Sequence, residues 1–98
     1  MTQAARSLSA KQIQERTQLH RLAVMVLARR SARKAVKARL KAQGIRVSLV
    51  PVRDINALAN DYLAEHRAFF MVEAKQAIAT YPGFARWRLP CADPAMER

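Results

Sequence analysis

The chain has 98 residues, and its 18 Lys and Arg residues outnumber its 7 Asp and Glu residues, so the formal charge is +11. This length suits one domain and excludes large catalytic architectures such as the TIM barrel. Hydrophobic residues make up 51% of the chain, which is too many for a wholly disordered chain and enough for one small core.

The positive charge is confined to the first half of the chain. Residues 1–46 contain twelve Lys and Arg residues and a single acid, Glu15, whereas residues 47–98 contain six cations and six acids. Such asymmetry favours an anionic partner, with nucleic acid first and an acidic membrane surface or an acidic protein second.

Two features bear on the cellular compartment. The lone cysteine, Cys91, has no partner for an internal disulfide, which favours a cytoplasmic protein over a secreted one. The longest apolar run, residues 22–28, is far shorter than the ~20 residues that a membrane-spanning helix needs. We therefore expect no membrane span.

The first predicted element is a long basic helix over residues 10–43. Residues 1–8 form a flexible lead, and Ser9 is a suitable N-cap for the helix that follows. Val24, Ala28, Ala32, Val36 and Leu40 recur at every fourth position, which predicts a narrow apolar face. The pattern leaves open a break near Ser31, and Gly44 is a favourable residue to end the helix.

The second half is predicted to be helical as well. Residues 45–50 read as a short strand or an extended connector, and Pro51 then opens an amphipathic region that runs to Pro82 and Gly83. This region forms one long helix or two shorter ones with a break between Glu65 and Ala68. Together with the first helix it completes one all-α domain over residues 9–83, followed by an irregular tail, residues 84–98, that is partly packed back.

Metal-binding and catalytic motifs are not evident. The two histidines, His20 and His66, have no ligand partners at the spacing that a zinc site needs, and two glycines are too few for a phosphate-binding loop. The acidic row Asp54, Asp61 and Glu65 is interpreted as a solvated helix flank or as a partner for the basic helix. We expect neither an enzyme nor a cofactor.

The basic helix carries the strongest functional signal. Arg29, Arg33, Lys37 and Lys41 fall at successive fourth positions and form one row along the helix. Like charges at this spacing repel by a few tenths of a kcal/mol each, so an external anion would relieve them. The predicted nucleic-acid-binding residues are Arg29, Arg30, Arg33, Lys34, Lys37, Arg39, Lys41, Arg46 and Arg53.

Residues 36–53 also resemble a known motif. A basic run from residue 36 leads into Gly44-Ile45-Arg46-Val47-Ser48, and Val52-Arg53 follow. This segment resembles the helix-turn-helix of insertion-sequence transposases. The resemblance implies a DNA-recognition helix with Ser48 as its N-cap. The recognition helix of that family is strongly basic, whereas here Asp54, Ile55 and Asn56 follow Arg53, which predicts little reading of bases.

The sequence therefore predicts a small nucleic-acid-binding protein that contacts the phosphate backbone through a basic helix. Regular rows of cations on a straight helix suit a phosphate backbone, and duplex DNA is favoured over structured RNA. The alternative is a helical adaptor or inhibitor that binds an acidic protein surface or forms a homodimer.

Overall fold

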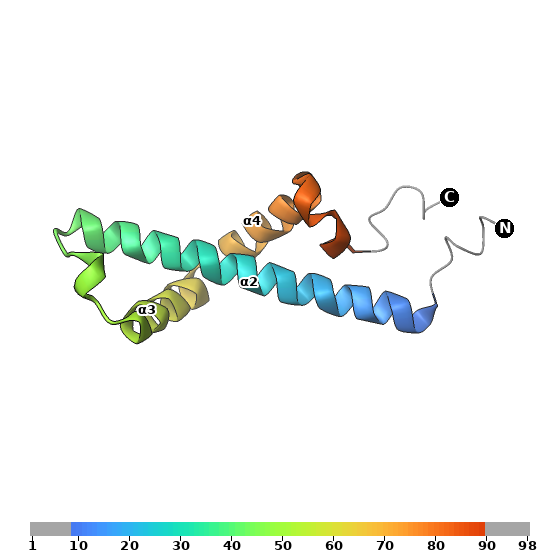
Figure 1. Ribbon diagram of the computed structural model, residues 1–98, viewed down its shortest axis with the longest axis horizontal. Helices are drawn as coiled ribbons and strands as arrows, with labels where there is room; N and C mark the ends of the chain where they lie inside the picture. The colour runs from blue at the N-terminus through green and yellow to red at the C-terminus, as the bar shows by residue number, and fades with distance from the viewer. Residues whose placement is uncertain (1–8, 90–98) are drawn as a thin grey trace.

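A computed structural model describes residues 9–89 of the chain, and within this part it contains helices and no strand (Figure 1). The predicted all-α fold is thus confirmed. The predicted lead (1–8) and the end of the tail (90–98), which includes Cys91, lie outside the described residues. The elements in chain order are α2 (Ala10–Ala42), the 3-10 turn η1 (Val47–Leu49), α3 (Val52–Glu65), α4 (Arg67–Thr80) and the 3-10 segment η2 (Pro82–Trp87).

Helix α2 is continuous and is closed at both ends by local hydrogen bonds. At its start, Ser9 Oγ accepts from the Gln12 amide at 3.1 Å, and Gln12 Oε1 accepts from the Ser9 amide at 2.9 Å. At its end, the Ile45 amide donates to the Leu40 carbonyl at 3.0 Å, and Gly44 has a φ of 81°. This is the Schellman arrangement, which needs a left-handed residue after the C-cap. The predicted ends are confirmed, and no break occurs at Ser31.

Of the two alternatives predicted for residues 45–50, a short strand or an extended connector, the strand is wrong. Val47–Leu49 forms a 3-10 turn, closed by a bond of 3.0 Å from the Leu49 amide to the Arg46 carbonyl. A single short segment has no neighbouring strand to pair with in an all-helical fold, so its backbone groups bond locally. Pro51 then occupies the N-cap of α3, and no side chain caps this helix, so Ser48 does not act as the N-cap that the family resemblance implies.

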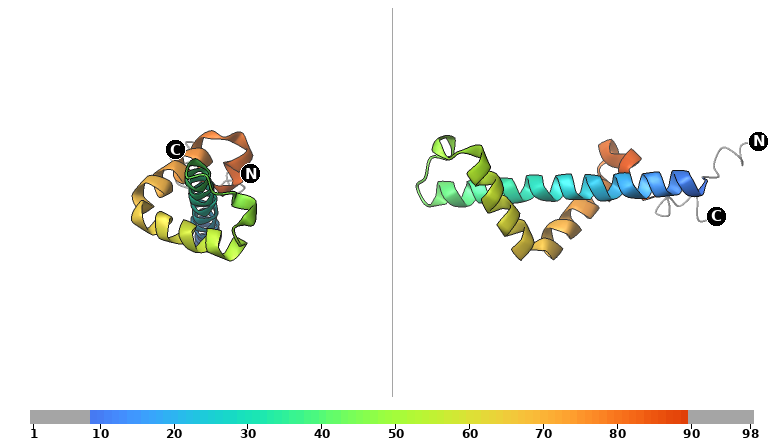
Figure 2. Two further views of the ribbon diagram at one scale, coloured as in Figure 1. Left: turned by 90° about the vertical axis from the view of Figure 1, so that its left-hand side faces the viewer. Right: turned by 90° about the horizontal axis from the view of Figure 1, so that it is seen from below.

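The second helical region divides at His66 into two helices of 14 residues each. They form a V whose arms both meet α2 (Figure 2). Each arm buries every fourth residue, and the buried residues are Ile55, Ala59 and Leu63 on α3 and Phe70, Ala74 and Ile78 on α4. The bend lets both arms lay their apolar face on α2, which a single straight helix would cross only once.

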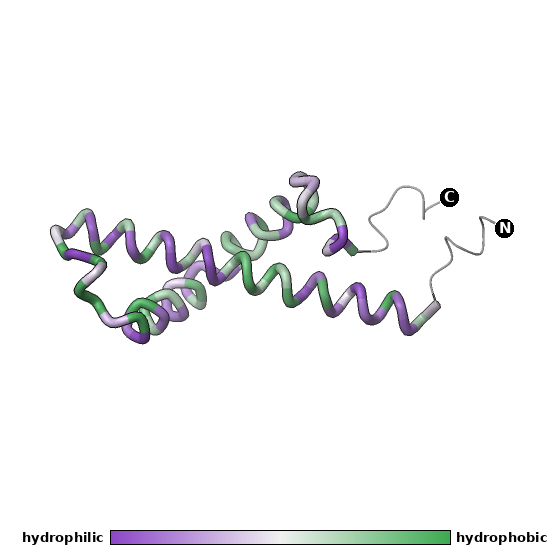
Figure 3. The backbone as a smooth tube through the Cα atoms, viewed as in Figure 1, coloured by the Kyte–Doolittle hydropathy of each residue, from purple (hydrophilic) through white to green (hydrophobic). Residues whose placement is uncertain are grey.

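The core is small and lies along one face of α2. The buried residues of α2 are Ala23, Val24, Ala28, Ala32 and Val36, which confirms the predicted stripe, with Leu40 half-buried at its end. Because Ala28 and Ala32 have short side chains, neighbouring helices can approach the backbone of α2 closely. Figure 3 shows that hydrophobic residues gather in the middle of α2, whereas its first turns are mostly hydrophilic.

Residues 82–89 pack back onto the helices. The rings of Phe84 and Trp87 stack with their centroids 5.1 Å apart, and His20 Nδ1 donates to the Trp87 carbonyl at 2.9 Å. Arg88 Nε donates to the Ile78 carbonyl at 2.8 Å. Through these contacts η2 packs against the end of α4 and the first half of α2.

The molecule is elongated, because α2 extends beyond the helices that cover it. The described part measures 61 × 22 × 22 Å. Its radius of gyration is 17.7 Å, whereas a compact domain of this length would have about 12 Å. None of the helices in residues 9–89 has the length and apolar character required to cross a membrane.

Candidate nucleic-acid interface

The predicted phosphate-contacting cations are all solvent-exposed. They nevertheless divide into groups with different surroundings, and the division follows from where α3, α4 and η2 cross α2.

The first group is the outer row, which consists of Arg29, Arg33, Lys37 and Lys41. Because α2 is unbroken, the spacing of four residues places these side chains along one side of the helix. Each lies one position after a member of the stripe from Ala28 to Leu40, which turns it about 100° away from that face. The row extends over about 18 Å of the helix axis.

The end of the outer row opens into a basic hollow. Lys37, Lys41, Arg46 and Ser48 line this surface depression of about 660 Å³, together with Gly44 and small or apolar neighbours. The Schellman turn reverses the chain after α2 and thereby returns Arg46 to the side of Lys37 and Lys41. No carboxylate is among the lining residues, so the hollow concentrates three positive charges.

Arg39 belongs to a different surface. Its guanidinium lies over the Tyr62 ring, 5.1 Å from the ring centroid, which is a cation–π contact. It also lines a smaller hollow of about 240 Å³ with Asp61 and Glu65 of α3. Two members of the predicted acidic row therefore lie beside a cation of the basic helix, on the α3 side of α2.

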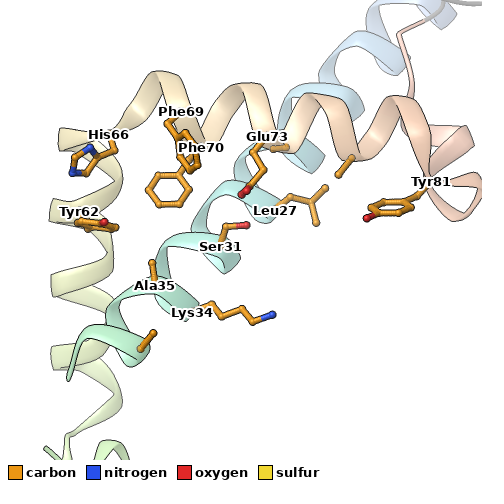
Figure 4. A pocket seen from close by; sticks show the side chains of 13 residues that line it. Leu27, Ser31, Lys34, Ala35, Tyr62, His66, Phe69, Phe70, Glu73 and Tyr81 are labelled. Atoms are coloured by element: carbon orange, nitrogen blue, oxygen red, sulfur yellow. The ribbon is translucent and has the colours of Figure 1, made fainter. Parts of the chain in front are cut away.

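Lys34 lines a wide groove between α2 and the two arms of the V (Figure 4). The groove has a volume of about 770 Å³, and Glu73 of α4 and the aromatic residues Tyr62, Phe69 and Tyr81 line it as well. Lys34 thus shares its groove with the carboxylate of Glu73, whereas no carboxylate lines the basic hollow.

The remaining two predicted cations lie apart from the basic hollow. Arg30 borders an apolar hollow of about 270 Å³ that Phe84 and Trp87 help to line. Arg53 is exposed in the first turn of α3, next to Asp54.

The side chains of the outer row make no hydrogen bond that stabilises the fold of residues 9–89. In residues 9–89, Arg88 is the one Lys or Arg whose side chain takes part in a hydrogen bond. Within the same part of the chain, no group of three or more His, Cys, Asp or Glu residues could hold a metal ion. Within residues 9–89, the outer row and Arg46 thus make no side-chain hydrogen bond that would compete with an external anion.

The sequence alone did not predict that Ser48 lines the basic hollow, and it did not show that the predicted cations lie on different surfaces. Ser48 lines the basic hollow, whereas the family resemblance implies for it only the role of a helix cap. Gly44 offered a signal, because a left-handed residue after a helix turns the following residues back toward it. The separation of Arg39 from the outer row depends on the position of Tyr62, which lies 23 residues further along the chain.

Comparison of the chain with family models, with curated proteins and with solved structures gives no significant match.

Proposed function

We propose that this protein binds the phosphate backbone of nucleic acid, with duplex DNA preferred over RNA, through the outer row and the basic hollow. The observation that carries the proposal is the convergence of Lys37, Lys41 and Arg46 in a hollow without a carboxylate. The proposal includes no catalytic role and places the protein in the cytoplasm.

Electrostatics supports an anion with many regularly spaced charges. Duplex DNA carries one negative charge per about 1.7 Å of its axis, so about ten phosphate charges lie along the 18 Å of the outer row. Each contact that forms releases counterions from the DNA, which gives an affinity that is independent of sequence. A small anion would neutralise only one end of such a row.

The connection between α2 and α3 favours backbone contact over base reading. A DNA-binding helix-turn-helix joins its helices by a turn of about three or four residues, whereas residues 43–51 separate α2 from α3 here. The first turn of α3 offers Arg53 as its cation beside Asp54. We therefore interpret the resemblance to transposase helix-turn-helix motifs as one of local sequence, and we propose little discrimination between DNA sequences.

Two variants of equal net charge test the proposal. The site variant combines Arg33→Glu, Lys37→Glu and Lys41→Glu, and the control variant combines Lys11→Glu, Arg67→Glu and Lys75→Glu. All six side chains are exposed, so both variants should keep the far-ultraviolet circular dichroism of the original chain.

Binding of a labelled duplex of mixed sequence is then measured by fluorescence anisotropy. We expect the site variant to lose binding by at least about 100-fold and the control variant to lose less than about tenfold, because contact depends on placement as well as on total charge. Equal losses in the two variants would contradict the site. A higher affinity for polyglutamate than for the duplex would instead support binding to an acidic protein surface.

A further inference from the structure

A second surface lies on α2, closer to its start than the basic hollow. Residues 10–22 contain no buried residue, although they form more than three turns of the helix. Leu19, Leu22 and Val26 are 40%, 57% and 58% exposed, which is unusual for large apolar side chains on one helix face. This part of α2 therefore presents an apolar surface that the other elements of residues 9–89 leave exposed.

The exposed residues follow the spacing of a coiled coil. Glu15, Leu19, Leu22, Val26 and Arg29 are separated alternately by four and three residues, which places them on one side of the helix. We call this set the seam. It has apolar residues in its middle, an acid at its first position and a cation at its last position. Glu15 is the single acid on α2.

The order of charges makes the seam complementary to itself in one orientation. Glu15 and Arg29 each lie seven residues from Leu22, which corresponds to about 10.5 Å along the axis. In an antiparallel pair of helices centred on Leu22, Glu15 of each copy lies level with Arg29 of the other. A parallel pair would instead place Glu15 beside Glu15 and Arg29 beside Arg29.

A neighbouring hollow offers additional apolar contact. Leu19, Leu22 and Val26 line the depression of about 270 Å³ that also contains Phe84 and Trp87. Apolar side chains from a second helix could fill it, and aromatic residues in a desolvated pocket contribute strongly to interfaces. Short helical segments with few tertiary contacts are only marginally stable in water. A covering helix would therefore also stabilise the first turns of α2, which contain no buried residue.

We infer that the seam binds a second copy of this chain as an antiparallel helix pair. The dimer leaves Lys37, Lys41 and Arg46 at its two far ends, because these residues lie at least fifteen positions from Leu22. Arg29 belongs to both the seam and the outer row, so the dimer shares one cation with the proposed nucleic-acid contact. The basic hollow lies outside the seam, and the test of dimerisation requires no nucleic acid.

The test is sedimentation equilibrium of the full chain, freed of nucleic acid, over roughly two decades of protein concentration. We expect the mass to rise with concentration from 11.1 kDa toward twice that value. Leu22→Glu should raise the dimer Kd at least about 100-fold, because each dimer would bury two unpaired carboxylates. The matched control is Leu49→Glu, since Leu49 is 75% exposed at the other end of the molecule.

A charge exchange tests the orientation. Glu15→Arg should raise the dimer Kd about tenfold in an antiparallel pair, and adding Arg29→Glu to the same chain should restore the original value. In a parallel pair Glu15→Arg would leave the Kd unchanged, because one like-charged pair replaces another. A wild-type chain that stays monomeric, equal effects of Leu22→Glu and Leu49→Glu, or no effect of Glu15→Arg would each overturn the inference.

Discussion

The salt dependence of DNA binding distinguishes the outer row and Arg46 from the full set of predicted cations. If these five residues contact phosphates, log affinity should fall with log salt at a slope of about −4.5, because each contact to duplex DNA contributes about −0.9. Raising the salt from about 50 to 200 mM then weakens binding roughly 500-fold. Contacts from all nine predicted cations would give a slope of about −8 and a loss of nearly 10⁵-fold.

Neutralising the basic hollow should reduce this dependence by a known amount. A variant with Lys37→Gln, Lys41→Gln and Arg46→Gln retains two of the five contacts, so its slope should be about −1.8. The same increase in salt would then weaken binding only about tenfold. Glutamine is a suitable replacement because it removes the charge and has a helix propensity close to those of Lys and Arg.

Arg39→Gln is the control for this series, because the Arg39 guanidinium lies over Tyr62. It should leave the slope unchanged, and anisotropy titrations of one labelled duplex at four or more salt concentrations would measure both values. A slope that stays near −4.5 in the triple variant would refute the assignment of contacts to the basic hollow. A reduction of about 0.9 in Arg39→Gln would show that the α3 side of α2 also contacts DNA.

Three further predictions concern stability. Ile78→Ala should lower the free energy of unfolding by about 2–4 kcal/mol and Tm by roughly 10–25 °C, because Ile78 is 1% exposed. Ile13 is 42% exposed, so Ile13→Ala should lower the free energy of unfolding by less than about 1 kcal/mol. Thermal melts followed by circular dichroism compare the two variants. Gly44→Ala should cost about 1 kcal/mol because of the φ of 81°, and Gly44→Asn should cost less, so equal denaturant midpoints for these two variants would contradict the strain argument. Ser9→Ala removes the capping box and should accelerate amide hydrogen exchange in the first turns of α2 without changing the global Tm.

The sequence was sufficient to predict the elements that depend on local chemistry. Ser9 caps the start of α2 and Gly44 lies just after its end, and the hydrogen bonds at both ends join residues close in sequence. The identities of these two residues therefore predict the bounds of the helix. The alanine-rich face was predictable for the same reason, because helical periodicity alone places Ala28 and Ala32 together.

The features that depend on tertiary contacts could be predicted only in part. The bend at His66 was one of two alternatives, since no Gly or Pro marks it. It is accompanied by a contact of 4.7 Å between the ring centroids of Tyr62 and His66 and one of 5.7 Å between those of Tyr62 and Phe70. The grouping of the cations likewise depends on where α3 and α4 cross α2, and helical spacing carries no information about that crossing.

The repetitive face of α2 has a consequence for how the helices find their alignment. Val24, Ala28, Ala32 and Val36 present similar surfaces at each turn, and all buried side chains within residues 9–89 are apolar. Sliding an arm of the V by one turn, about 5.4 Å, would therefore exchange alanine for alanine at little cost in the middle of the interface. Specific contacts at the two ends instead oppose a slide. His20 of α2 donates to the Trp87 carbonyl of η2, which Arg88 joins to the Ile78 carbonyl of α4, and Arg39 of α2 lies over the Tyr62 ring of α3.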